Sequence, residues 1–113
     1  MNVVINGDAV ACPVINQYEH DDAHFFEADD GKEKTQILIY LPFGITSGKY
    51  DLGLNLGVPM VVHVKNQTSE AVVFPGEMEL TVGGDAQFAG TFSGTDENGI
   101  SVENGSFKFD HPA

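Results

Sequence analysis

The chain has 113 residues, enough for one domain, and its 17 Asp and Glu residues stand against five Lys and no Arg, which gives a net charge of −12. Phosphate recognition depends on arginine forks and basic patches, so this balance argues against nucleic acid and anionic membranes as partners. The charge fits solubility through self-repulsion, and it also fits a cation site or a basic partner.

The N-terminal stretch alternates short β-prone runs with turn signals. Residues 1–5 predict a first strand, which the turn dipeptide Asn6–Gly7 ends. Residues 9–15 predict a second strand, and Pro13 would confine it to a sheet edge or a bulge because proline lacks a backbone N–H.

An acid-rich stretch follows. Residues 18–34 hold seven Asp and Glu residues, and by this pattern they form the least globular part of the chain. Within them we expect one strand at 24–28 and a hairpin turn at 29–32, where Asp, Asp, Gly and Lys follow one another.

The clearest predicted strand lies at residues 35–41. Ile37, Ile39 and Leu41 point one way, while Leu38 and Tyr40 point the other. Apolar residues on both faces indicate a central strand, or a strand with one face covered by a loop or a partner. Because a single sandwich layer covers only one face, we also predict a homodimer.

The strands predicted next alternate apolar and polar residues. Residues 49–56 place Tyr50, Leu52, Leu54 and Leu56 inward. Residues 77–82 alternate in the same way, with Met78, Leu80 and Val82 inward. A further strand is predicted at 60–65 without such alternation, and a short apolar run at 71–74 is closed by Pro75–Gly76.

Residues 87–109 predict a phenylalanine-rich hairpin around the turn at 96–99, and four of the eight Phe residues of the chain lie in it. Phe88, Gly90, Phe92 and Gly94 share one face, and Phe107 and Phe109 share a face of the second strand. We expect the glycines to let an aromatic ring from another strand pack over them, and we expect a bulge at 103–105.

No window keeps a 3.6-residue period long enough for a helix. Eight or nine short strands separated by turn signals predict an all-β fold, an antiparallel β-sandwich or flattened barrel, as a single domain over residues 1–113. Cys12 is the only cysteine, so an internal disulfide is excluded.

The runs GKYDL at 48–52, MELTV at 78–82, FAGTFSGT at 88–95 and ISVENGSFKF at 100–109 resemble small bacterial β-sandwich domains of unknown function, often lipoprotein-borne in Bacteroidetes. The opening INGDAVAC is similar to their first strand and turn. The resemblance covers about two thirds of the chain, it rests on turn and packing residues, and it implies no catalytic residues.

Localisation is predicted only from the absence of signals. No apolar run approaches the ~18 residues of a membrane span. The first ten residues lack a basic region followed by an apolar one, so they do not form a signal peptide. We expect either a cytoplasmic protein or a secreted domain without its leader.

Two motifs that imply catalysis fail on spacing. Residues 44–49 are one residue short of a P-loop, and a strand rather than a helix follows them. Ser93 sits one place too late for a nucleophile elbow, and no histidine lies near it in sequence, although a spatial triad stays open.

The run from His20 to His24 is the most suggestive one for a metal. His20 and His24 would share a face on one helix or strand, with Asp21 and Asp22 between them, and histidine with carboxylates suits zinc. The alternative is a solvated acidic loop with two surface histidines. His63 and His111 are too distant in sequence to be assigned.

Two turns, at 29–31 and 96–99, group oxygen ligands of the kind calcium accepts, but neither matches EF-hand spacing. Turn chemistry alone also explains Asp, Asn and Gly at these positions.

These observations favour a binding or interaction module without catalytic activity, which presents an acidic face to a protein partner or to a second copy. The alternative is a small-ligand or carbohydrate-binding sandwich, with calcium as a helper. A hydrolase with a spatially assembled site is the third interpretation.

Overall fold

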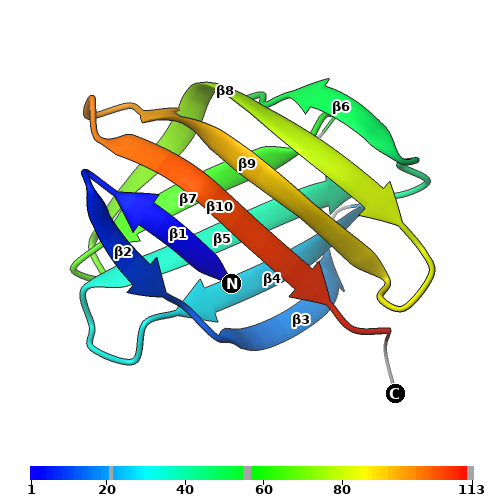
Figure 1. The fold of residues 1–113 in the computed structure, drawn as a ribbon, viewed down its shortest axis with the longest axis horizontal. Helices are drawn as coiled ribbons and strands as arrows, with labels where there is room; N and C mark the ends of the chain where they lie inside the picture. Colours follow the sequence, from blue (N-terminus) through cyan, green and yellow to red (C-terminus); the bar gives the residue numbers. More distant parts are fainter. Residues whose placement is uncertain (21, 55–56, 112–113) are drawn as a thin grey trace.

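Ten antiparallel strands form one strongly curled sheet, and the described residues contain no helix (Figure 1). The structure is a computed structural model that describes residues 1–20, 22–54 and 57–111. The strands are β1 (Asn2–Ile5), β2 (Asp8–Ala11), β3 (Val14–His20), β4 (Ala23–Asp29), β5 (Thr35–Pro42), β6 (Gly48–Asp51), β7 (Met60–Lys65), β8 (Ser69–Val82), β9 (Phe88–Asp96) and β10 (Ser101–Phe109). The predicted all-β class is therefore confirmed, with ten strands in place of eight or nine.

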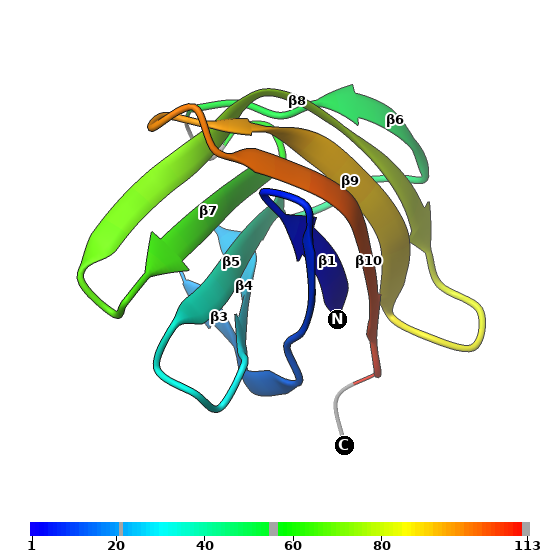
Figure 2. The ribbon, with the colours of Figure 1, turned by 60° about the vertical axis from the view of Figure 1, so that its left-hand side comes forward.

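The sheet runs in the order β2-β1-β10-β9-β8-β7-β5-β4-β3, and β6 pairs with β8 outside this path. We call β1, β2, β6, β9 and β10 the front layer, and β3, β4, β5 and β7 the back layer. The first part of β8 pairs with β7, and its second part pairs with β6 and β9, so β8 belongs to both layers. Figure 2 shows β8 arching from one layer to the other, which gives the sheet its half-barrel shape.

The core lies between the two layers and is rich in aromatic rings. The Phe26 ring of the back layer stacks on Phe109 of the front layer, with ring centroids 3.8 Å apart and planes 7° apart. Phe107 stacks on Phe109 at 4.7 Å. Ile37, Ile39 and Leu41 of β5 are fully buried on the same side. The two layers are thus held together mainly by apolar burial across the half-barrel.

Strand β8 corrects the prediction that Pro75–Gly76 separates two strands. The strand continues through both residues, and its register against β9 shifts between Val73 and Gly76. A Cβ at Gly76 would lie 2.6 Å from the carbonyl oxygen of Ser93, so the backbones approach closely here. A bulge with a glycine bends a strand from one layer into the next without ending it.

The acid-rich stretch 18–34 is the second correction, because most of it is ordinary sheet rather than the least globular part. Strand β4 pairs with β3 on one side and with β5 on the other, and its Phe26 and Ala28 are buried in the core. The expected hairpin turn after β4 is confirmed, since Asp29 and Asp30 accept hydrogen bonds from Gly31 and Lys32. Charge content misled the prediction because the described acids of this stretch occupy exposed or half-exposed positions, and the buried positions of β4 stay apolar.

Two predicted strands are too long. The run 9–15 divides at Cys12 and Pro13 into β2 and β3, which lie at opposite edges of the sheet. The run 49–56 ends as a strand at Asp51, because the Leu52 N–H bonds to Gly76 and the Gly53 N–H bonds to Pro59. Leu52 is buried as expected, whereas Leu54 is 59% exposed, and Leu56 lies outside the described residues.

The phenylalanine-rich hairpin has the predicted form. Strands β9 and β10 pair around a turn in which the Gly99 N–H donates to the Asp96 carbonyl, and the register shifts between Val102 and Gly105 as a bulge would require. Glycines admit the rings: the Phe107 ring lies over Gly90, and the Phe92 ring lies over Gly105. An aromatic ring over a strand glycine shields its backbone from water and fixes the register.

Gly105→Ala is expected to lower the free energy of unfolding by about 1 to 3 kcal/mol through overpacking. A Cβ at this position would lie 2.6 Å from Cε2 of the Phe92 ring, and that ring is only 3% exposed and cannot swing into solvent. Urea titration measures the loss. Ala89→Ser on β9 is the control; Gly83→Ala is unsuitable because the φ of Gly83 is positive. If Gly105→Ala is as stable as the wild type, the close packing of the Phe92 ring on Gly105 is contradicted.

Candidate functional site

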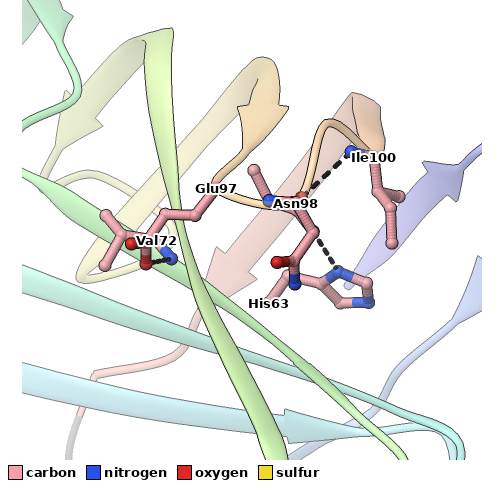
Figure 3. A network of polar contacts seen from close by, with 6 residues as sticks. His63, Val72, Glu97, Asn98 and Ile100 are labelled. Atoms are coloured by element: carbon pink, nitrogen blue, oxygen red, sulfur yellow. Dashed lines mark hydrogen bonds and ion pairs between the residues drawn. The ribbon is translucent and has the colours of Figure 1, made fainter.

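A histidine–aspartate pair is buried between the layers at one end of the half-barrel, and Figure 3 shows His63 beside the residues of the β9–β10 turn. His63 of β7 is 2% exposed and Asp96 of β9 is 3% exposed, and the His63 Nδ1 lies 2.9 Å from the Asp96 Oδ2. The other carboxylate oxygen of Asp96 accepts the backbone N–H groups of Asn98 and Ile100. The aspartate therefore joins the two layers and also caps the turn of the hairpin.

These bonds determine the charge of Asp96. Burial acts most strongly and would raise its pKa, but the hydrogen bonds from His63, Ile100 and Asn98 outweigh it and hold the pKa below the usual aspartate range. The neighbouring Glu97 reaches the other side of the loop, where its Oε1 accepts the Val72 N–H at 2.8 Å (Figure 3). The network holds the β9–β10 turn against β7 and β8.

Sequence reasoning missed this pair because 33 residues separate its members. Asp96 was interpreted as a turn residue or calcium ligand, and its turn role is confirmed by the two backbone bonds that it accepts. A single histidine within the apolar predicted strand 60–65 was the one available signal, since a histidine buried in a core strand needs a hydrogen-bonding partner.

The pair does not assemble a hydrolase triad with Ser93. Ser93 is exposed on the outer face of β9, whereas its neighbour Phe92 and the pair lie on the inner face. Cys12 is fully buried, and burial followed by the nearby Asp30 raises its thiol pKa to about 11, which removes the reactive thiolate. The run 44–49, which fails the P-loop spacing, leads into strand β6 as expected.

The outer face of the back layer carries a row of large apolar side chains. Tyr18, Phe25, Tyr40 and Met60 lie directly opposite one another on β3, β4, β5 and β7, and we call them the aromatic face. Phe25 packs between the two tyrosines, with ring centroids 4.7 Å from Tyr18 and 4.9 Å from Tyr40. Tyr18 is 47% exposed, so one end of the row faces solvent.

The aromatic face shares Phe25 with a second apolar cluster, whose other buried residues are Leu38, Val62 and Val64. This cluster explains why β5 is apolar on both sides: the strand lies centrally between β4 and β7, as expected, and its outer side chains are covered within the chain. Tyr40 and Met60 form part of that cover.

Carboxylates border the aromatic face. Glu27 lies opposite Leu38, and Glu70 lies opposite Val64, both on the outer side of the layer. Burial raises the pKa of the Tyr40 hydroxyl, and the negative charges of Glu70 and Glu27 raise it further. The Tyr40 hydroxyl is thus held in a negative field.

A pocket of about 420 Å³ opens at the mouth of the half-barrel, where the edge of the back layer meets the end of the front layer. We call it the mouth pocket. Phe26 and Tyr18 line it as well, the Phe26 ring from the inner face, whereas the Tyr18 ring lies on the outer face against Phe25. Its polar lining consists of Gln17, Glu19, His24, Gln87 and His111.

The outer face of the front layer carries a larger and shallower groove of about 620 Å³. Asp51 and Glu77 lie directly opposite each other on β6 and β8 and lead into it, with Ser93 next in the same row. The groove is negative because three carboxylates, those of Asp51, Glu77 and Glu79, line it against one lysine, and like charges directly opposite on neighbouring strands repel. It contains one cation, Lys49, among the residues that line it.

The predicted metal residues are only partly described. Asp21 and the side chain of His20 lie outside the described residues. His20 and His24 do not share one strand, because a turn separates His20 at the end of β3 from β4. The His24 imidazole contacts the rings of Phe43 and Phe88 at 4.9 and 5.0 Å. In the ranges that the structure covers, no three His, Cys, Asp or Glu side chains converge as a metal site would require. A zinc or calcium site at His20, Asp21, Asp22 and His24 stays a prediction.

Comparison with protein-family models, with curated proteins and with solved structures finds no match to this chain. The resemblance to Bacteroidetes-type β-sandwich domains therefore stays a prediction. Within the described ranges, no helix is long and apolar enough to cross a membrane.

Proposed function

We propose that this protein is an interaction module that binds a basic segment of another protein on its aromatic face. The supporting observation is the cross-strand row of Tyr18, Phe25, Tyr40 and Met60 on the outer sheet face, bordered by carboxylates. Tyr18 is exposed, Tyr40 and Met60 are half-buried, and Phe25 packs beneath them. Protein interfaces are enriched in Tyr, Phe and Met at their centre and have a polar rim. The face has both features.

The charge of the rim selects the partner. Glu27 and Glu70 lie close enough to Tyr40 to raise its pKa, and they are carboxylates at the border of an aromatic surface. Arginine matches this chemistry because its planar guanidinium stacks on aromatic rings and pairs with carboxylates at its edge. A segment with arginines is therefore the expected occupant.

The same rim disfavours a second copy of this chain. Two copies meeting through this face would bring the Glu27 and Glu70 carboxylates of both together, within molecules that each carry a net charge of −12. The predicted homodimer is thus the competing occupant. Sedimentation of the free protein separates the two: a dimer that dissociates in Tyr18→Ala would overturn the proposal.

A peptide that alternates Arg with Ser is expected to bind and to change tyrosine fluorescence, while a peptide that alternates Glu with Ser is not. The chain has three Tyr and no Trp, so Tyr18 and Tyr40 supply much of the signal. Tyr18→Ala should lower the affinity for the Arg peptide about tenfold by removing a stacking ring. Glu70→Lys should weaken it about fivefold by removing one rim charge and adding a repulsive one.

Glu103→Lys on β10 is the matched control, because Glu103 is exposed on the front layer and the substitution changes the net charge equally. Equal weakening by Glu70→Lys and Glu103→Lys would show attraction to the overall charge, and would contradict a site on the aromatic face.

A further inference from the structure

We infer that the mouth pocket is a separate binding site for a small, uncharged, polyhydroxylated ligand such as a sugar ring. The site lies at the open end of the half-barrel, a location where ligand pockets commonly form, and its volume of about 420 Å³ is at the small end of their range. It shares only Tyr18 with the aromatic face.

Two amide side chains form a hydrogen-bonding fork in the pocket. The Gln17 Nε2 donates to the Gln87 Oε1 at 3.1 Å and to the Asp110 carbonyl at 3.3 Å, which fixes both amides in place. Among the described residues nothing bonds to the Gln17 Oε1 or the Gln87 Nε2. The fork therefore presents one acceptor and one donor side by side, which matches two adjacent hydroxyl groups because each can both donate and accept.

Aromatic rings give the pocket an apolar side, as a sugar ring with its C–H face requires. The Phe26 ring, which lines the pocket from the inner face, is stacked on Phe109. The His24 imidazole stands between Phe43 and Phe88, so it is held in one orientation. These rings are positioned before any ligand arrives, which lowers the entropy cost of binding.

The charges of the lining favour an uncharged ligand. The lining contains no lysine, so it lacks the usual binding group for phosphate or carboxylate. It contains one carboxylate, Glu19, and no metal-ligating trio converges within the described ranges. The groove on the front layer differs on this point, since three carboxylates and one lysine line it.

Titration of the full chain with methyl glucoside, N-acetylglucosamine and glucose 6-phosphate, followed by two-dimensional NMR, tests the site. The expected result is a shift of the Gln17 and Gln87 side-chain amide signals with a neutral sugar at millimolar concentration, and a smaller shift with the phosphorylated one. Gln87→Ala should weaken neutral sugar binding about tenfold, because the donor of the fork is lost and the Gln17 amide loses the acceptor that orients it. An oligosaccharide of the same sugar should then be titrated. If it binds more tightly than the methyl glycoside, the bound ring is the terminal sugar of a chain rather than a free monosaccharide.

Gln36→Ala is the matched control, because Gln36 bonds to Asp29 on the outer face of the back layer, away from the pocket. Gln87→Glu separates a loss of binding from a loss of folding, because it keeps an acceptor for Gln17 and removes only the donor. This variant should bind the neutral sugar as weakly as Gln87→Ala does, while its NMR spectrum keeps the dispersion of a folded protein. The inference is overturned if no neutral sugar shifts these signals, if glucose 6-phosphate binds more tightly, or if the shifts appear at Thr91 and Ser93 of the outer groove.

Discussion

Phe107→Ala is expected to lower the free energy of unfolding by about 3 to 5 kcal/mol, the range for removing a buried phenylalanine ring. Phe107 is 5% exposed, stacks on Phe109 at 4.7 Å and covers Gly90, which has no side chain of its own to fill the space that the ring would leave. Phe92→Ala should cost a similar amount, because its ring covers Gly105. A typical domain is held together by about 5 to 15 kcal/mol, so either variant loses a large share of its stability.

Two further hairpin variants calibrate this result in the same denaturant melts. Gly99→Ala should cost about 1 to 2 kcal/mol, since Gly99 has a φ of 79° and an L side chain is strained there. Ser93→Ala should be nearly silent because the Ser93 side chain is exposed on the outer face. A tolerant Phe107 with a damaging Ser93 would mean that the layers pack through the other face of the hairpin.

Asp96→Ala is expected to cost about 3 to 5 kcal/mol, the range for removing one partner of a buried pair. The substitution leaves the His63 Nδ1 without its acceptor between the layers, and it also releases the N–H groups of Asn98 and Ile100. Asp85→Ala, which removes an exposed carboxylate from the β8–β9 turn, is the control and should be neutral. Equal stability of the two variants would show that the pair contributes nothing.

The same pair predicts acid sensitivity. Because the pKa of Asp96 is lower in the folded chain than in the unfolded one, its stabilisation is fully present above the unfolded aspartate pKa. It is lost as the pH falls below that value and passes through the folded pKa. Urea melts between neutral pH and pH ~3 should therefore show stability falling on acidification, and Asp96→Asn should flatten that fall while lowering stability at neutral pH. An unchanged slope in Asp96→Asn would assign the acid sensitivity to other carboxylates.

The pattern of apolar residues along the sequence was enough to predict strand β5 and the β9–β10 hairpin. The run 35–41 covers all but the last residue of β5, and its apolar character on both sides correctly indicated a central strand. The glycines at 90 and 105 and the phenylalanines that cover them were readable in the sequence, because residues two apart share a face and the hairpin turn sets which strand lies opposite.

What only the tertiary structure decided is which distant residues meet. The bend in β8 depends on how closely its backbone approaches β9 at Gly76, and a proline beside a glycine looks the same in a turn as in such a bulge. The contacts of His63 with Asp96 and of Gln17 with Gln87 span 33 and 70 residues. Periodicity along one strand records which face a side chain occupies, but the residue that it meets across the core depends on strand order and register, which arise from packing the two layers together.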